Sequence, residues 1–275
     1  MIELEHVSFA YADQGPSVQD VSFRLEKGEF AAVLGANGAG KTTTVRLMDG
    51  LLKPTSGRVL INGADTAQTQ VSERARRVGF LFQNPDRQIC KNTVREEILF
   101  GLRTVRAEEG EDALRARAEA VLAEFAFTGD EEPFSLSRGQ RQRVALASIL
   151  AVEPEILILD EPTTGLDYLE CCQIMDRIRR MNQEKQVTVV MVCHDMEVVL
   201  DYARRALVMA GGRLLADGPV PEIFRNPDLM EQASILPPQM IGLGTRLGKG
   251  FENATSPEAV ADTVLSLQGK GGHAE

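Results

Sequence analysis

Several features that define common protein classes are missing from this sequence of 275 residues. None of the four cysteines belongs to a C-x-x-C pair, so a zinc site has little support, and we expect reduced, partly buried thiols in a cytosolic protein. No apolar run approaches the roughly 20 residues that a membrane span requires. The opening MIELEHVSF has no basic region followed by an apolar stretch, so it predicts no signal peptide. Any contact with a membrane is therefore expected to go through a partner.

The sequence also lacks an excess of basic residues. Thirty Lys and Arg residues stand against 40 Asp and Glu residues, and the formal net charge is -10. Such a chain has no broad basic surface for non-specific nucleic-acid binding, which counts against DNA or RNA as the main partner. The 43% of hydrophobic and 25% of charged residues are typical of a globular protein with one large or two modest domains.

Two kinds of periodicity divide the chain. Between Ile2 and Leu25, apolar and polar residues alternate, which predicts antiparallel strands with one buried face. From Phe30–Leu34 onward, short apolar runs alternate with helical segments, and this pattern implies a mostly parallel sheet. The region from about 86 to 152 has apolar residues at helical spacing and interrupts the alternation.

The last stretch, residues 226–275, has a different composition. It contains Pro237-Pro238 and several glycines, so we expect it to begin as a loop. Ser256-Pro257-Glu258 predicts the start of a short helix. The final residues, 269–275, are expected to be frayed.

A glycine-rich turn follows the strand predicted at Phe30–Leu34. The segment GANGAGKT fits the pattern G-x-x-x-x-G-K-[ST], between a predicted strand and a predicted helix. Glycines let backbone N–H groups surround phosphates at a helix N-terminus, where the dipole favours anions. Lys41 would supply positive charge to the β- and γ-phosphates of ATP, and Thr42 a hydroxyl ligand to Mg²⁺. The alternative, a plain strand–helix turn, does not require Lys and Thr in these positions.

A second strand, Ile156–Leu159, ends in two acids, Asp160 and Glu161. Asp160 can hold Mg²⁺. Successive strand residues point to opposite sides, so Glu161 is free to act as a general base toward water. The alternative is a pair of exposed acids at a strand end. Together with the glycine-rich turn, these acids predict an α/β fold of the P-loop NTPase type. The periodicity described above adds a mostly parallel core sheet, an N-terminal antiparallel β subdomain, an inserted α-helical subdomain and a small C-terminal extension.

Four further elements accompany the phosphate loop and the acid pair. They are Gln83 after the strand Val78–Phe82, the turn Leu136-Ser137-Arg138-Gly139-Gln140 before a helix, Pro162-Thr163-Thr164-Gly165-Leu166-Asp167 after the acids, and His194 after the strand Val187–Val192. These six elements, in this order, resemble the ATP-binding subunit of ABC transporters over about residues 1–225. The resemblance implies an ATPase domain over 1–225, with its helical subdomain at about 86–152, and an extension over 226–275.

The resemblance also implies that the site is shared. In that family two subunits stack head-to-tail, and a signature turn of one covers the γ-phosphate held by the other. Residues 136–140 are the signature turn of this chain. Ser137 would then donate its hydroxyl and Gly139 its backbone N–H to the partner's ATP, and Asp167 would cross the interface. Ser137 and Asp167 are also good helix N-caps, so these structural roles stay open. The family usually has glycine where this chain has Arg138, whose long side chain faces solvent or reaches toward the γ-phosphate.

The same resemblance assigns the remaining positions. Gln83 would touch Mg²⁺ and sense the membrane partner, His194 would hold the γ-phosphate and orient water, and Tyr11 would stack on adenine. The alternatives without a catalytic or binding role are a polar strand end for Gln83, a helix cap beside Asp195 for His194 and a structural role for Tyr11. The expected catalytic residues are Glu161, His194 and Gln83. The expected nucleotide-binding residues are Tyr11, Gly35, Asn37, Gly38, Gly40, Lys41, Thr42, Thr43, Ser137, Gly139, Gln140 and Asp167, and the expected Mg²⁺ ligands are Thr42, Gln83 and Asp160.

Two short segments are similar to one branch of the family. The string FQNPDRQI, residues 82–89, and the tail ASILPP, residues 233–238, look like those of energy-coupling-factor transporters and their cobalt or nickel uptake relatives. In that branch the C-terminal extension helps to hold two ATPases together. The similarity implies a second ATPase subunit of the same or another kind, a transmembrane coupling subunit and a substrate-binding membrane protein. The chain would then lie peripherally on the cytoplasmic face of the membrane and power uptake of a vitamin or a transition-metal ion. The alternative is an ABC-type ATPase acting on nucleic acid or ribosomes, but such proteins carry long coiled coils or two cassettes.

Overall fold

Two β-sheets form the centre of the computed structural model, which describes residues 1–12, 15–248, 250–251 and 256–270. One sheet has four strands in the order β2-β1-β4-β5, and the other has six strands in the order β10-β9-β3-β8-β7-β6. The strands of the first sheet are β1 (Ile2–Ala10), β2 (Pro16–Leu25), β4 (Ser56–Ile61) and β5 (Ala64–Asp65). The strands of the second are β3 (Phe30–Leu34), β6 (Val78–Leu81), β7 (Ile156–Asp160), β8 (Thr188–Val192), β9 (Arg205–Ala210) and β10 (Arg213–Pro219).

The four-stranded sheet is antiparallel throughout, as the alternating pattern predicts. β1 pairs with β2 on one side and with β4 on the other. Ile2, Leu4 and Val7 are fully or almost fully buried, whereas the intervening residues are more exposed. One face of this sheet therefore packs on the interior and the other faces solvent.

The six-stranded sheet is parallel except for its edge strand. β6, β7, β8, β3 and β9 run in the same direction, and β10 returns antiparallel to β9. All residues of β3, β7 and β8 are buried, because both faces of the sheet are covered. Along β3, Ala32 and Leu34 belong to one hydrophobic cluster, and Ala31 and Val33 belong to the other. The core is therefore two apolar layers separated by the parallel sheet.

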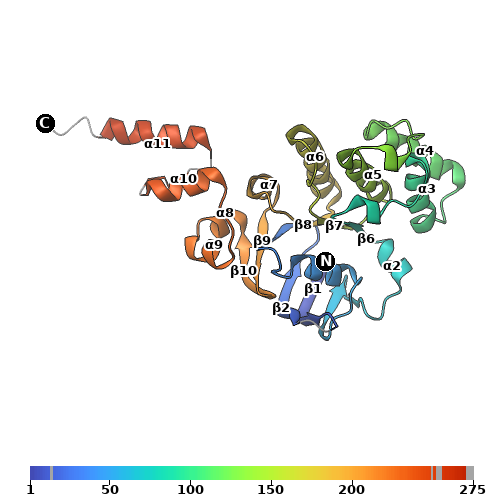
Figure 1. The fold of residues 1–275 in the computed structure, drawn as a ribbon, viewed down its shortest axis with the longest axis horizontal. Coiled ribbons are helices and arrows are strands. Elements are labelled where there is room, and N and C mark those ends of the chain that lie inside the picture. The colour runs from blue at the N-terminus through green and yellow to red at the C-terminus, as the bar shows by residue number, and fades with distance from the viewer. Residues whose placement is uncertain (13–14, 249, 252–255, 271–275) are drawn as a thin grey trace.

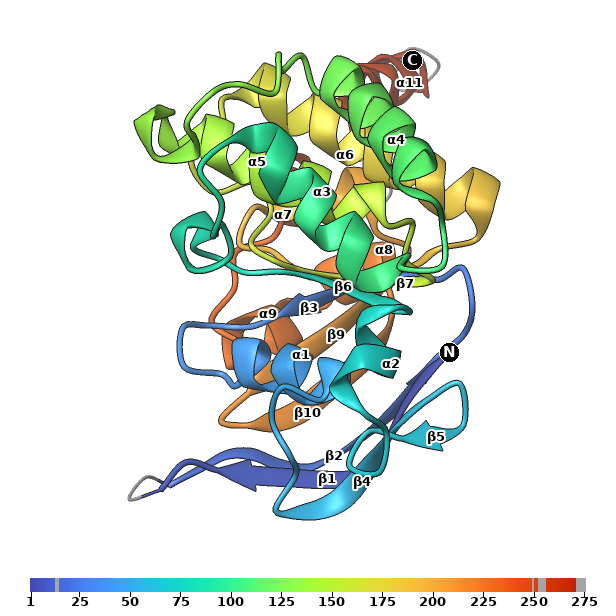
Figure 2. The same cartoon turned by 90° about the vertical axis from the view of Figure 1, so that its right-hand side faces the viewer.

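The helices complete these layers. They are α1 (Lys41–Asp49), α2 (Val71–Ala75), α3 (Val94–Val105), α4 (Glu111–Glu124), α5 (Arg138–Ala151), α6 (Tyr168–Lys185), α7 (Met196–Tyr202), α8 (Val220–Phe224), α9 (Pro227–Gln232), α10 (Gln239–Leu247) and α11 (Pro257–Lys270), with single turns of 3₁₀-helix at Pro85–Arg87 and Pro133–Ser135. Figure 2 shows α1 between the two sheets and α3–α6 above the parallel sheet. None of the helices in the described part of the chain is long and apolar enough to span a bilayer.

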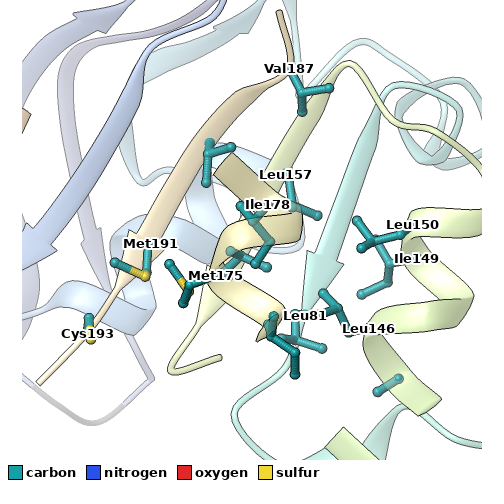
Figure 3. Packing of buried hydrophobic residues seen from close by; sticks show 14 of the residues in the cluster. Leu81, Leu146, Ile149, Leu150, Leu157, Met175, Ile178, Val187, Met191 and Cys193 are labelled. Carbon is teal, nitrogen blue, oxygen red and sulfur yellow. The ribbon is translucent and has the colours of Figure 1, made fainter. Parts of the chain in front are cut away.

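The helix-covered face holds the larger cluster. In Figure 3, Leu81, Leu157 and Met191 of three neighbouring strands meet side chains of α6 and α5. Helices α3, α4 and α5 pack on one another and form the inserted helical subdomain at one end of the molecule (Figure 1). The predicted fold class is confirmed: a parallel core sheet, an antiparallel N-terminal sheet and an inserted helical subdomain.

The expectation that residues 226 onward begin as a loop is wrong. Helix α9 starts at Pro227, where the Asn226 side chain accepts a hydrogen bond from the Leu229 N–H, and α10 starts directly after Pro238. These prolines stand at or before a first helical turn, where the missing N–H has no intrahelical partner to lose. Helix α11 begins at Pro257 as predicted and continues through Lys270, past the expected start of fraying. Residues 271–275 lie outside the described part of the chain.

Replacement of Asn182 by alanine tests how α6 is attached to the sheet. Asn182 is buried, and its side-chain N–H₂ group donates to the backbone carbonyls of Gly28 and Val187, each at 2.8 Å. The alanine variant leaves both carbonyls without this donor, so we expect the free energy of unfolding to fall by about 2–3 kcal/mol. Urea denaturation measures the change. The exposed neighbour provides the control: Gln183→Ala should cost less than about 0.5 kcal/mol, and equal losses in the two variants would contradict this account.

Candidate active site

The parallel strands end at one edge of the sheet, and the predicted site residues follow those ends. β3 leads into the glycine-rich loop, β7 ends at Asp160, β8 leads to His194, and β6 leads to Gln83. The strands are in register at this edge, where Asp160 pairs with Val192 and Val33 pairs with the same residue from the other side. In open α/β sheets, ligands bind outside the carboxyl ends of the strands. The topology therefore brings these segments together although they are far apart in the sequence.

The glycine-rich loop needs glycine for two separate reasons. Gly35 has φ +148°, and a Cβ there would lie 2.2 Å from the backbone oxygen of Met209 in β9. Gly40 has φ +99°, and a Cβ there would lie 2.5 Å from the backbone oxygen of Ser17 in β2. The loop backbone is thus pressed against both sheets. Glycine at these two positions is therefore required by packing alone.

Lys41 occupies the centre of this loop. Its side chain is buried, and Nζ donates to the backbone carbonyls of Gly35 at 2.8 Å and Ala36 at 2.9 Å. Burial lowers the pKa of Lys41, while the nearby carboxylates of Glu161 and Asp160 raise it. The loop carbonyls thus hold the ammonium group beside both acids. A phosphate oxygen is the natural replacement for these acceptors, so the loop fits an anionic nucleotide tail.

Thr42 and Asp160 form the second part of the site. The Thr42 hydroxyl donates to Asp160 Oδ1 at 3.3 Å, and Asp160 is 1% exposed. Burial raises the pKa of Asp160, and the hydrogen bond from Thr42 opposes that effect. A buried carboxylate next to a hydroxyl is a pair of hard oxygen donors, which suits Mg²⁺. The residues present therefore fit a magnesium ion.

Glu161 and His194 form a close pair beside them. His194 Nε2 lies 3.0 Å from Glu161 Oε1, and the Thr164 hydroxyl donates to Glu161 Oε2 at 3.1 Å. Glu161 lies just beyond β7 with φ +56°, and its backbone N–H donates to the Val192 carbonyl. The prediction of the direction of the Glu161 side chain relied on strand alternation. Glu161 lies outside the strand in a left-handed conformation, so this conformation sets the direction of its side chain. Thr164 was missed, and nothing in its position along the sequence marks it as a partner of Glu161.

The signature turn and the loop after the acids form a second group. Ser137 caps α5: its Oγ accepts from the Gln140 N–H at 3.2 Å, and Gln140 Oε1 accepts from the Ser137 N–H at 2.9 Å. Asp167 caps α6 through the same reciprocal arrangement with Glu170. The helix-capping alternatives are thus present in the structure. Ser137 and Asp167 are both exposed, so each is also accessible to a partner subunit.

Gly139 and Gly165 bring these two segments into contact. A Cβ at Gly139 would lie 3.0 Å from the Gly165 carbonyl oxygen, and a Cβ at Gly165 would lie 3.4 Å from Cδ of Arg138. The aliphatic part of Arg138 therefore lies beside Gly165, a placement that the sequence left undecided. Thr164 touches Glu161 and the next residue, Gly165, touches the signature turn, so the loop over residues 162–167 links the two groups.

Tyr11 and Gln83 lie at the margins of the site. The Tyr11 ring packs edge-on against Phe9, with centroids 4.9 Å apart, and its hydroxyl lies 3.4 Å from the Thr43 hydroxyl of α1. Gln83 is exposed on the segment after β6. That segment is tied to the signature helix, because the Asp86 carboxylate lies 2.7 Å from Arg141 Nε of α5. The sequence pattern offers no signal for this ion pair, whose members belong to different motifs.

Known proteins are similar to this chain. The model of the ABC transporter family matches residues 18–164. The energy-coupling factor transporter ATP-binding protein EcfA of Methanothermobacter thermautotrophicus is 39% identical over 257 residues, which are 92% of this chain and 82% of EcfA. A Methanosarcina mazei relative is 41% identical over 252 residues, which are 91% of this chain and 42% of the relative. The chain spans about two fifths of the length of several such curated relatives.

Two solved structures resemble the whole cassette. The ATP-binding cassette MJ0796, in a dimeric post-hydrolysis state bound to ADP and Pi, has a TM-score of 0.74 at 28% identity and covers 80% of this chain and 99% of its own. CbiO1 from Clostridium perfringens, part of the ABC transporter complex CbiONQ, has a TM-score of 0.72 at 32% identity and covers 84% of this chain and 92% of its own.

Replacement of Asp160 by asparagine tests the electrostatics of the site. Because folding raises the pKa of Asp160 above its ordinary 3.8, the nucleotide-free protein loses stability as the pH rises from about 3.8 through that raised pKa. Asparagine keeps the acceptor for Thr42 without the buried charge. We expect the variant to melt above the parent at pH 7, because asparagine carries no charge that burial would desolvate. The gap should shrink toward pH 4.

The same variant should gain less from magnesium and nucleotide. Differential scanning fluorimetry with and without Mg²⁺ and a non-hydrolysable ATP analogue measures this, since a ligand stabilises the fold only by binding it. Asp112→Asn, on the exposed first turn of α4, is the control and should behave as the parent does. An Asp160→Asn protein that melts below the parent at pH 7, or that keeps the full stabilisation by magnesium, would refute the assignment.

Proposed function

The chain belongs to the ABC transporter family, and we propose on that basis that it is the ATP-hydrolysing subunit of a membrane importer of the energy-coupling-factor type. Members of the family hydrolyse ATP to drive transport. The observation that carries the proposal is one constellation at the carboxyl edge of the sheet. Lys41 is held inside the phosphate loop, Thr42 contacts Asp160, and Glu161 lies 3.0 Å from His194.

ATP binds with its phosphates in the glycine-rich loop. The phosphates bind backbone N–H groups at the N-terminus of α1. These groups belong to the first turn of α1, including Thr43, and to the loop residues Gly35, Asn37, Gly38 and Gly40. Lys41 exchanges its carbonyl acceptors for phosphate oxygens. Tyr11, whose hydroxyl lies beside Thr43, provides the ring on which adenine stacks.

Thr42, Asp160 and Gln83 would hold Mg²⁺. The ion supplies charge neutralisation to the phosphates when it is bound. Thr42 and Asp160 are already in contact, whereas Gln83 lies on an exposed segment tied to α5 through Asp86 and Arg141. A change in nucleotide state at Gln83 therefore reaches the signature helix through this ion pair.

Glu161 acts as the general base. Both of its carboxylate oxygens are occupied in this structure, one by Thr164 and the other by His194. Water that attacks the γ-phosphate needs one of these oxygens to accept its proton. His194 has a side chain that is 45% exposed, and it moves from Glu161 to the γ-phosphate when ATP binds. Movement of His194 thus clears one side of Glu161 Oε1 for the attacking water, while Thr164 keeps the carboxylate oriented.

The pocket is completed by a second cassette. Gly139 is the second residue of α5, so its backbone N–H has no intrahelical partner and can bind an anion. Ser137, Gln140 and Asp167 lie on the same surface as this helix start. They bind the ATP held by the partner cassette, as the head-to-tail arrangement requires. The dimeric state of the similar cassette MJ0796 supports this part of the proposal.

The branch assignment rests on similarity to named relatives. EcfA is an energy-coupling factor ATPase, and CbiO1 is part of a CbiONQ complex. We infer that this chain pairs with a second ATPase subunit, identical or different, and drives a transmembrane coupling subunit with a substrate-binding membrane protein. It then lies peripherally at the cytoplasmic face of the membrane. The imported substrate is a vitamin or a transition-metal ion that never touches this subunit.

Replacement of Glu161 by glutamine tests the central step. The variant keeps its size and its contacts with Thr164 but cannot accept a proton, so we expect kcat to fall by roughly 10²–10⁴. Binding of a non-hydrolysable ATP analogue should be retained. His194→Ala should also lower kcat. The control is Glu132→Gln on the exposed turn before the signature, which should hydrolyse ATP as the parent does. Parent-level turnover by Glu161→Gln would exclude Glu161 as the base.

A further inference from the structure

A segment of the C-terminal extension borders the proposed site. We call residues 234–239 the strap. One cavity of about 560 Å³ has Glu161 and His194 on one wall and the strap residues Leu236 and Pro237 on another. A second hollow of about 350 Å³ lies between the phosphate loop at Asn37 and the same Leu236. Leu236 and Pro237 follow His194, the last predicted motif residue, by more than 30 positions. They nevertheless lie at the place where the γ-phosphate is expected.

Both ends of the strap are anchored by hydrogen bonds. At its start, the Ile235 N–H donates to the Met230 carbonyl of α9 at 2.9 Å, next to Ser234 with φ +53°. At its end, the Gln239 N–H donates to Glu197 Oε1 at 2.7 Å. Gln239 is the first residue of α10, so its N–H has no intrahelical partner and Glu197 serves as a carboxylate cap for that helix. Bonds of this charge-assisted kind are among the stronger hydrogen bonds in proteins.

Glu197 also belongs to the element that carries His194. β8 ends at Val192 and α7 begins at Met196, so His194 lies in a three-residue connection. The far end of that connection is fixed by Asp195, whose carboxylate accepts from the N–H groups of Glu197 at 3.0 Å and Val198 at 3.3 Å. The first turn of α7 is therefore held by two carboxylates, one of which reaches to the strap.

We propose that Glu197 is a positioning residue for ATP hydrolysis: by binding the Gln239 N–H, it holds the strap against the start of α7 and keeps the connection that carries His194 in place, so that His194 reaches the γ-phosphate when ATP binds. The inference rests on the function proposed above for His194 and Glu161. It assigns the C-terminal extension a role at the reacting centre of its own subunit. We call the hydrogen bond between the Gln239 N–H and Glu197 the tether. Its loss leaves the fold and the phosphate loop intact but allows His194 to sample unproductive orientations.

The tether can be cut at the donor alone. Gln239→Pro removes the N–H while keeping a residue that is favoured at the first helical position, and the extended Pro238 (φ -49°, ψ 145°) suits a position before proline. Gln239→Ala keeps the N–H and is the matched control. The acceptor is tested separately: Glu197→Ala removes it, and Glu197→Gln keeps an acceptor oxygen. If the proline variant fails to fold, the Glu197 pair carries the test.

ATP turnover of the whole chain is measured at protein concentrations where activity per molecule is constant. We expect Gln239→Pro and Glu197→Ala to lower kcat by about tenfold, since small misplacements of a catalytic group cost up to about 10² in rate. Equilibrium binding of a non-hydrolysable ATP analogue and the oligomeric state should not change. Gln239→Ala and Glu197→Gln should stay close to the parent. The double variant Glu197→Ala/Gln239→Pro should be no slower than either single variant, because both remove the same bond.

Two results would overturn the inference. One is parent-level kcat in both Gln239→Pro and Glu197→Ala. The other is a loss of analogue binding or of oligomer in proportion to the loss of kcat, which would show that the strap supports assembly rather than His194. His194→Ala separates this failure from failure of the proposed function. If His194→Ala hydrolyses ATP as the parent does, the catalytic role proposed for His194 and the inference fall together; if it is inactive while the tether variants are active, only the inference falls.

Discussion

The parallel ladder β6–β7–β8–β3 is the constraint on which the site depends. Its strands end in register, so residues that immediately follow them meet at one edge although they come from four parts of the chain. The register is maintained because both faces of the sheet are buried, one under the helices and one under α1 and the antiparallel sheet. The buried charges of Lys41 and Asp160 are tolerated at this edge because each has a polar partner: the Gly35 carbonyl of the same loop for Lys41, and the Thr42 hydroxyl of the neighbouring segment for Asp160.

The site has two groups of residues joined by short, direct contacts. Loop 162–167 touches Glu161 through Thr164 and the signature turn through Gly165, while the ion pair Asp86–Arg141 joins the Gln83 segment to the signature helix. A movement of the helical subdomain therefore changes the surroundings of Glu161 and Gln83 together. The tether from Glu197 to Gln239 adds a third connection, from the C-terminal extension to His194. Under the proposed function, these contacts are the physical route by which a partner subunit would act on hydrolysis.

Elements whose signals are local could be predicted from the sequence. Helix α1 starts at Lys41 and ends before its C-cap Gly50, and α6 starts after Asp167, because glycine, phosphate-loop and capping patterns act within a few residues. Helices α9 and α10 were missed because the prolines at their starts also fit a loop, whereas the helix start at Pro257 was predicted. The direction of Glu161, its contact with Thr164 and the bond between Glu197 and Gln239 depend on tertiary placement or on an unusual φ, which no spacing encodes. The roles of Ser137, Gly139 and Asp167 toward a partner still rest on resemblance, because one chain contains only half of that interface.

The central claim is that neither copy of the cassette completes a catalytic pocket alone. Steady-state ATP turnover per molecule, measured over a dilution series alongside sedimentation of the same samples, tests it most directly. Turnover per molecule should fall on dilution in parallel with the fraction of dimer and recover when the protein is concentrated again. A chain that sediments as a monomer and still hydrolyses ATP at the undiluted rate per molecule would contradict the account.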